Sequence, residues 1–183
     1  MKIITITGPS GVGKGYLKDR IKQRWPNTIY ELPWYTTRPP REDEQHRCDR
    51  IHVTAREFAT KRMLVTDEVA GYLYGLSADP VSEHSVVLVE LRCHLLDQLH
   101  FKDTFSIALV AHTDFLRSRI MRRATESDHE VKQRIAVAEN DMHRMDIVRA
   151  RFSFFYEVSA ENEHLVVEQS IQALTSYMPS KEE

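Results

Sequence analysis

The sequence has few of the features that mark secreted, zinc-stabilised or membrane proteins. Its 183 residues include only two cysteines, Cys48 and Cys93, too few for a disulfide framework and without a CxxC or zinc-ligand spacing. The longest apolar runs, such as residues 107–111, are too short to span a bilayer. The N-terminus lacks the apolar stretch and cleavage site of a signal peptide. We therefore expect a cytoplasmic protein without a membrane partner.

The chain also has no excess of positive charge. Lys and Arg number 25 and Asp and Glu number 27, so the net charge is −2 and no overall basic field for nucleic acid exists. The hydrophobic share of 42% and the charged share of 28% are typical of an ordinary globular domain. We expect one domain over residues 1–183 and no nucleic-acid partner; a monomer and a homodimer both fit this composition.

Short β-branched runs alternate with longer helical patterns along most of the chain. This alternation is typical of an α/β fold with a parallel sheet flanked by helices. The expected strands cover residues 2–7, 85–90, 105–111 and 154–158. The expected helices cover residues 13–24, 94–99, 130–145 and 163–178, and one further helix begins after Thr113.

Residues 34–79 interrupt this alternation with prolines, a dense charge cluster and strand-like pieces too short for parallel neighbours. We therefore expect a core made of residues 1–33 and 80–183, with residues 34–79 as a small inserted module. A module beside the mouth of a parallel sheet is where a second substrate would be held.

A glycine-rich segment follows the first expected strand and opens the first helix. Its GxxxxGK spacing is that of a P-loop, in which backbone N–H groups and the helix N-terminus hold phosphates. Lys14 would reach the β- and γ-phosphates of ATP. The expected ATP-binding segment consists of Gly8, Pro9, Ser10, Gly11, Val12, Gly13, Lys14 and Gly15.

One position of this loop differs from the usual pattern. The residue after the lysine is normally Ser or Thr, whose hydroxyl binds Mg²⁺, but here it is Gly15. Either Mg²⁺ is held by nucleotide oxygens, waters and a carboxylate elsewhere, or phosphoryl transfer is impaired. Glu90, at the C-terminal end of an apolar strand, is the best candidate for that carboxylate.

Several motifs in order resemble the guanylate kinase family over nearly the whole chain. GPSGVGK resembles the phosphate loop of that family, residues 35–44 (YTTRPPREDE) its TTRxPRxxE signature, and residues 72–75 (YLYG) its YYG segment. The resemblance implies a P-loop NTPase-type core, a monophosphate-binding module and a mobile lid at residues 120–130. It also implies phosphoryl transfer from ATP, with Mg²⁺, to a nucleoside monophosphate, with GMP to GDP as the first expectation.

The resemblance further implies roles for individual residues. Planar guanidinium groups suit phosphate because they bind its oxygens bidentately. Between residues 117 and 134, six Lys or Arg stand against three Asp or Glu. The residues expected to act on the ATP phosphates are Lys14, Arg119, Arg123 and Arg134. The residues expected to bind the acceptor are Arg38, Arg41, Glu44, Asp67 and Tyr74.

Some positions differ from the family pattern, and they bear on the acceptor. Trp34 replaces a serine, Arg50 replaces a tyrosine, and Leu76 replaces a hydroxyl residue. The candidates for the guanine-reading glutamate of the family are Thr66, Asp67 and Glu68. Two alternatives therefore stay open: a phosphosugar kinase of the ribose 1,5-bisphosphate phosphokinase type, and a guanylate-kinase-like binding module with impaired catalysis.

Overall fold

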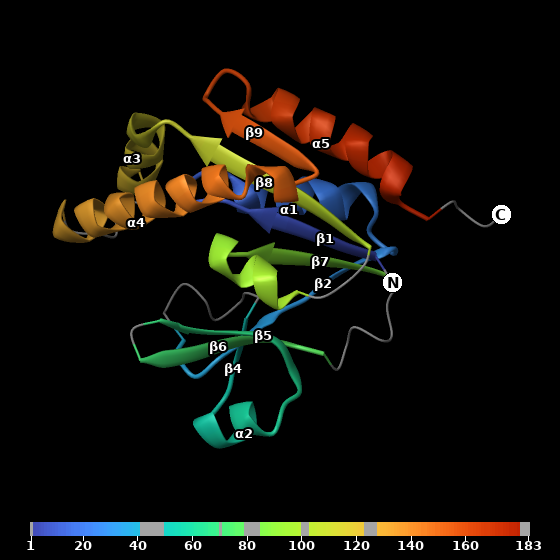
Figure 1. Ribbon diagram of the computed structural model, residues 1–183, viewed down its shortest axis with the longest axis vertical. Helices are drawn as coiled ribbons and strands as arrows, with labels where there is room; N and C mark the ends of the chain where they lie inside the picture. Colours follow the sequence, from blue (N-terminus) through green and yellow to red (C-terminus); the bar gives the residue numbers. More distant parts are fainter. Residues whose placement is uncertain are drawn as a thin grey trace.

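β-branched runs build the larger of two sheets. The computed structural model describes residues 2–40, 50–69, 71–78, 85–99, 103–122 and 128–179. Within them, five parallel strands pair in the order β2-β7-β1-β8-β9 (Figure 1). Their bounds are β1 (Lys2–Thr7), β2 (Ile29–Glu31), β7 (Val86–Leu91), β8 (Thr104–Ala111) and β9 (Phe154–Val158). The expected α/β class with a parallel sheet is confirmed.

Helices cover both faces of this sheet, which explains why its strands are continuous apolar runs. On one face Ile4 and Ile6 pack in a cluster with Leu17 and Leu174, and on the other Ile3 packs in a second cluster. The helices are α1 (Lys14–Arg24), α3 (Thr113–Met121), α4 (Asp128–Ile147) and α5 (Glu163–Tyr177), with the 3-10 helices η3 (Cys93–Gln98) and η4 (Arg149–Arg151). Among the described residues, none of the helices has the length and apolar character needed to cross a membrane.

The smaller sheet is formed by residues of the segment expected as an insertion. Its strands pair in the order β4-β3-β6-β5, and Figure 1 shows them with a short helix, α2, on the β2 side of the larger sheet. A capping box between Thr54 and Glu57 begins that helix. The bounds are β3 (Trp34–Thr36), β4 (Arg50–His52), α2 (Ala55–Ala59), β5 (Met63–Val69) and β6 (Tyr72–Ser77).

The structure corrects several local expectations. β3 and β4 pair in parallel although each has three residues, because a long connection separates them and permits a crossover. The helix expected at residues 94–99 is the 3-10 helix η3, in which Leu95 N–H donates to the carbonyl of Arg92. α3 begins at Thr113 itself rather than after it, and His112 is its cap, since the His112 side chain accepts from Asp114 N–H.

We expect Leu174→Ala to lower the free energy of unfolding by about 2–5 kcal/mol, because the side chain is fully buried and its removal leaves a cavity. Leu165, on the same helix α5, is 46% exposed, so Leu165→Ala should cost less than about 1 kcal/mol. Urea unfolding measures both variants. Equal losses would contradict the packing of α5 described above.

Candidate active site

The chain leaves β1 at Thr7 and turns through the glycine-rich loop into α1. Gly11 (φ +87°) and Gly13 (φ +108°) adopt left-handed backbone that other residues rarely tolerate. At Gly8 a Cβ atom would lie 2.5 Å from the carbonyl oxygen of Leu109, so only glycine lets the loop pass against β8. The loop and the first turn of α1 therefore have the backbone of an anion-binding site.

Lys14 lies folded over its own loop. Its Nζ donates to the carbonyls of Gly8 (2.9 Å) and Pro9 (3.0 Å) and is 3.4 Å from Oε1 of Glu90. Glu90 reaches this position because β1 and β7 pair in parallel with Ile6 opposite Glu90, so both strands end at the same edge. Trp34 contributes an indole N–H that donates to the Glu90 carbonyl at 3.0 Å.

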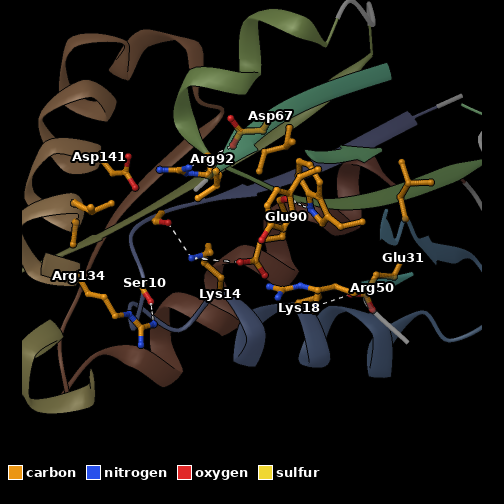
Figure 2. A pocket seen from close by; sticks show the side chains of 18 of the residues that line it. Ser10, Lys14, Lys18, Glu31, Arg50, Asp67, Glu90, Arg92, Arg134 and Asp141 are labelled. Atoms are coloured by element: carbon orange, nitrogen blue, oxygen red, sulfur yellow. Dashed lines mark hydrogen bonds and ion pairs between the residues drawn. The ribbon is translucent and has the colours of Figure 1, made fainter. Parts of the chain in front are cut away.

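A cleft of about 550 Å³ lies over this edge, between the larger sheet, the smaller sheet and α4. Figure 2 shows the Lys14–Glu90 and Ser10–Arg134 contacts in one part of it and the Asp67–Arg92 pair in another. The cleft brings together residues from both halves of the chain. The sequence-predicted residues that line it are Gly8, Ser10, Lys14, Asp67, Tyr74, Glu90 and Arg134.

Two of the expected arginines are placed differently from each other. The Arg134 guanidinium on α4 donates to the hydroxyl of Ser10, which ties α4 to the phosphate loop (Figure 2). Arg119 on α3 instead pairs with Glu163, with Nη1 2.5 Å from Oε1, and is not among the described residues that line the cleft. Of these two arginines, only Arg134 donates a hydrogen bond to the phosphate loop in this conformation.

Arg38, the described arginine that we expected to bind the acceptor, is also absent from the cleft lining. Arg38 Nη1 donates to the Pro39 carbonyl at 3.1 Å, and Arg38 is not among the described lining residues. Arg50, which replaces a tyrosine of the family pattern, does line the cleft. The remaining expected positions lie outside the described residues: they are Arg41, Glu44, Arg123 and residues 123–127 of the expected lid.

Several lining residues were not predicted. Lys18 follows Lys14 by one helical turn and so shares its face of α1, a spacing that the sequence does contain. Arg92 follows Glu90 by two residues at the carboxyl edge of the sheet, which is also a readable signal. Glu31 could not be found in this way because β2 is a three-residue strand with no clear pattern of its own.

Glu31 holds two lysines of α1 at the wall of the cleft. Its carboxylate lies 2.6 Å from Nζ of Lys18 and 2.5 Å from Nζ of Lys22. Burial raises the pKa of Glu31, but hydrogen bonds and positive charge from Lys18 and Lys22 together outweigh burial and hold that pKa below its ordinary value. Glu31 is therefore a carboxylate at neutral pH.

The donor set near Lys14 suits a Mg²⁺ ion that arrives with a nucleotide. The described residues contain no group of three or more His, Cys, Asp or Glu that could hold a metal by itself. Mg²⁺ commonly keeps several waters and takes one or two carboxylates plus phosphate oxygens. Glu90 supplies one such carboxylate beside the lysine of the loop, and Gly15 supplies none.

A parallel sheet whose first strand runs through a glycine-rich, lysine-ended loop into a helix defines a P-loop nucleotide-phosphate-binding protein. The family model described as guanylate kinase matches residues 1–180. The guanylate kinase of Synechocystis sp. is 31% identical over 86% of this chain and 84% of its own length. That of Thermosynechococcus vestitus is 30% identical over 77% of this chain and 79% of its own.

A solved structure has the same fold. The crystal structure of guanylate kinase from Anaplasma phagocytophilum matches with a TM-score of 0.66 and 18% identity, over 98% of this chain and 87% of that one. The chain belongs to the guanylate kinase family.

We expect Glu31→Gln to lower the free energy of unfolding by about 1–2 kcal/mol at pH 7, because the largely buried Lys18 and the more exposed Lys22 both lose their carboxylate partner. A pKa lowered by folding gives stability that is present above the unfolded-state value and lost as the pH falls through the folded-state value. The difference in the free energy of unfolding between wild type and Glu31→Gln should therefore become smaller as the pH falls. Urea unfolding at a series of pH values measures this difference.

The exposed Glu161 offers a matched control, and Glu161→Gln should leave stability nearly unchanged at every pH. If the difference in the free energy of unfolding between wild type and Glu31→Gln stayed constant down to pH 3, the role given to the carboxylate charge would be contradicted.

Proposed function

We propose that this protein transfers the γ-phosphoryl group of ATP to GMP, giving ADP and GDP. The observation that carries the proposal is one cleft with a phosphate loop and Lys14 in one part and Asp67 and Tyr74 of the smaller sheet in another. Such a cleft can hold two nucleotides with their phosphates between the sheets. Membership of the guanylate kinase family supports GMP as the acceptor.

The phosphate loop and Lys14 would hold the β- and γ-phosphates of ATP. In the proposed reaction Lys14 exchanges Glu90 and the loop carbonyls for phosphate oxygens. Arg134 is already at the loop through Ser10 and would add positive charge where the transferring group becomes more negative. Phosphoryl transfer needs alignment, positive charge and exclusion of water more than it needs covalent participation of the protein.

When bound, Mg²⁺ would supply positive charge that offsets the charge of the phosphates. Glu90 is the residue proposed to hold it, together with the nucleotide and water. Arg119 pairs with Glu163 and does not line the cleft in this conformation, so it would have to move to contact a phosphate in its proposed role. By analogy with the motif of the guanylate kinase family, Arg123 is proposed to act together with Arg119 on the ATP phosphates.

We further propose that residues 34–79 hold the acceptor and that residues 120–130 close over the site as a lid. Within the acceptor module, the proposed GMP-binding residues are Arg38, Arg41, Glu44, Asp67 and Tyr74. The location proposed is the cytoplasm, and the assembly a monomer or a homodimer. A phosphosugar kinase and a catalytically impaired binding module are not favoured, because the matched relatives reported above are guanylate kinases and the loop keeps its lysine.

The direct test is ADP release from ATP and Mg²⁺ with a panel of acceptors: GMP, dGMP, AMP, CMP, UMP, dTMP and ribose 1,5-bisphosphate. We expect GMP to be turned over with the highest kcat/KM. Turnover of ribose 1,5-bisphosphate alone would assign the protein to the phosphosugar kinases. The absence of ADP with every acceptor, while ATP still binds, would contradict the proposed function.

Gly15→Ser should lower the Mg²⁺ concentration that gives half-maximal turnover, because it restores the hydroxyl ligand that P-loop enzymes use. The change fits sterically, since a Cβ atom at Gly15 meets nothing within 4 Å. Gly15→Ala is the matched control, because it adds the Cβ atom without the hydroxyl. An unchanged Mg²⁺ dependence in Gly15→Ser would mean that Glu90 and the nucleotide already complete the metal shell.

A further inference from the structure

The part of the cleft that faces the smaller sheet carries an arginine that no motif predicts. Arg92 follows β7, and its Nη1 lies 3.4 Å from Oδ2 of Asp67 on β5. Both side chains line the cleft, one from each sheet. In Figure 2 the pair lies apart from the Lys14–Glu90 and Ser10–Arg134 contacts of the phosphate loop, so it belongs to the acceptor part of the cleft.

Asp67 is held in one orientation by its surroundings. Its Oδ1 accepts from the backbone N–H of Glu68 (3.0 Å) and lies 3.2 Å from Nε2 of His94, and its side chain is only 13% exposed. The backbone N–H of the neighbouring Thr66 donates to Oε1 of Gln98 (2.9 Å), and Nε2 of Gln98 donates to the Thr66 carbonyl (3.0 Å), which fixes β5 against η3. Of the three candidates for a base-reading residue, Asp67 is the one that lines the cleft.

Arg92 has donors to spare for a ligand. An arginine carries five N–H donors, and its printed contact with Asp67 involves only Nη1. The side chain remains 41% exposed, and Figure 2 shows it between Asp67 and Asp141. Asp67 and Arg92 thus present a hydrogen-bond acceptor and a set of donors side by side, with Val69 and Leu91 as apolar neighbours in the lining.

A carboxylate beside an arginine complements the hydrogen-bonding edge of guanine but not that of adenine. Guanine presents two donors, N1–H and the N2 amino group, beside the acceptor O6, whereas adenine presents the acceptor N1 beside the N6 amino donor. A carboxylate facing the N1 lone pair of adenine would be left without a hydrogen bond, and unmatched buried polar groups discriminate strongly between ligands. Arginine is also a common partner of guanine O6 in other complexes.

We propose that Arg92 is a specificity-determining residue that donates to O6 of the acceptor guanine, while the adjacent Asp67 accepts from N1–H and the N2 amino group. This inference rests on the proposed function, because it takes GMP as the acceptor. It adds a residue outside the family motifs, and it explains why a cation stands beside the base-reading carboxylate.

The test compares kcat/KM for GMP, IMP and AMP in wild type, Arg92→Met and Asp67→Asn. IMP keeps O6 and N1–H but lacks the N2 amino group. Arg92→Met should lower kcat/KM for GMP and IMP by the same factor, about 10- to 100-fold, and leave AMP nearly unchanged. Asp67→Asn should lower kcat/KM for GMP more than kcat/KM for IMP, because only GMP places a second donor on the carboxylate.

These substrate patterns separate base reading from mere positioning. If Arg92 acted only by orienting Asp67, Arg92→Met would reproduce the Asp67→Asn pattern, with a greater loss for GMP than for IMP, and the inference would be overturned. An equal loss for GMP, IMP and AMP would overturn it too, while leaving the proposed function intact. A wild-type enzyme that turns over neither GMP nor IMP would overturn both.

Two further variants guard against a folding artefact. Arg92→Lys keeps the charge but not the planar set of donors, so it should retain more GMP activity than Arg92→Met and less than wild type. Arg56→Met removes an exposed arginine from α2 in the same part of the chain and should change no kcat/KM. Thermal unfolding of each variant shows whether it is folded at the assay temperature.

Discussion

The parallel pairing of β1 with β7 and β8 is the constraint on which the rest of the structure depends. Because the three strands run the same way, the residues that follow them meet at one edge of the sheet. The phosphate loop follows β1, and Glu90 and Arg92 lie at the end of β7. A shift of one residue in the β1–β7 register would reverse the face on which Glu90 points and separate it from Lys14.

The second feature of the cleft is that three of its described cations are paired with carboxylates. Lys14 is paired with Glu90, Lys18 with Glu31, and Arg92 with Asp67. Such pairs limit the repulsion that several cations around one cavity would otherwise cause in the absence of ligand. Phosphate groups would then compete with the carboxylates for cations that are already oriented. Glu31, with its lowered pKa, differs in pairing with two lysines, Lys18 and Lys22.

The sequence predicts the parts of this arrangement that depend on local signals. The phosphate loop is readable because strand, glycines, lysine and helix are contiguous, and the core strands because their β-branched runs are buried on both faces. The three-residue strand β2 and the 3-10 geometry of η3 have no comparable local signal. Both are set by what packs against them, β7 in the first case and β5 and α4 in the second.

The candidate site was predictable to the same extent. Lys14, Glu90 and Arg134 were found because a motif or a strand end marks each of them. The position of Arg92 after a strand end is readable, but its pairing with Asp67, which is 25 residues away in sequence and on the other sheet, is not. Arg38 stands in a clear family motif, yet in this structure its guanidinium donates to Pro39, which no sequence pattern could indicate.

The measurement that tests the central claim most directly is the fate of the γ-phosphate of labelled ATP when the enzyme is mixed with GMP and Mg²⁺. Separation of the products shows where the label goes. We predict that the label appears in GDP and not in inorganic phosphate, because the proposed reaction requires the two nucleotides to be aligned and water to be excluded. Label released as inorganic phosphate, or retained in ATP while both nucleotides are bound, would contradict it.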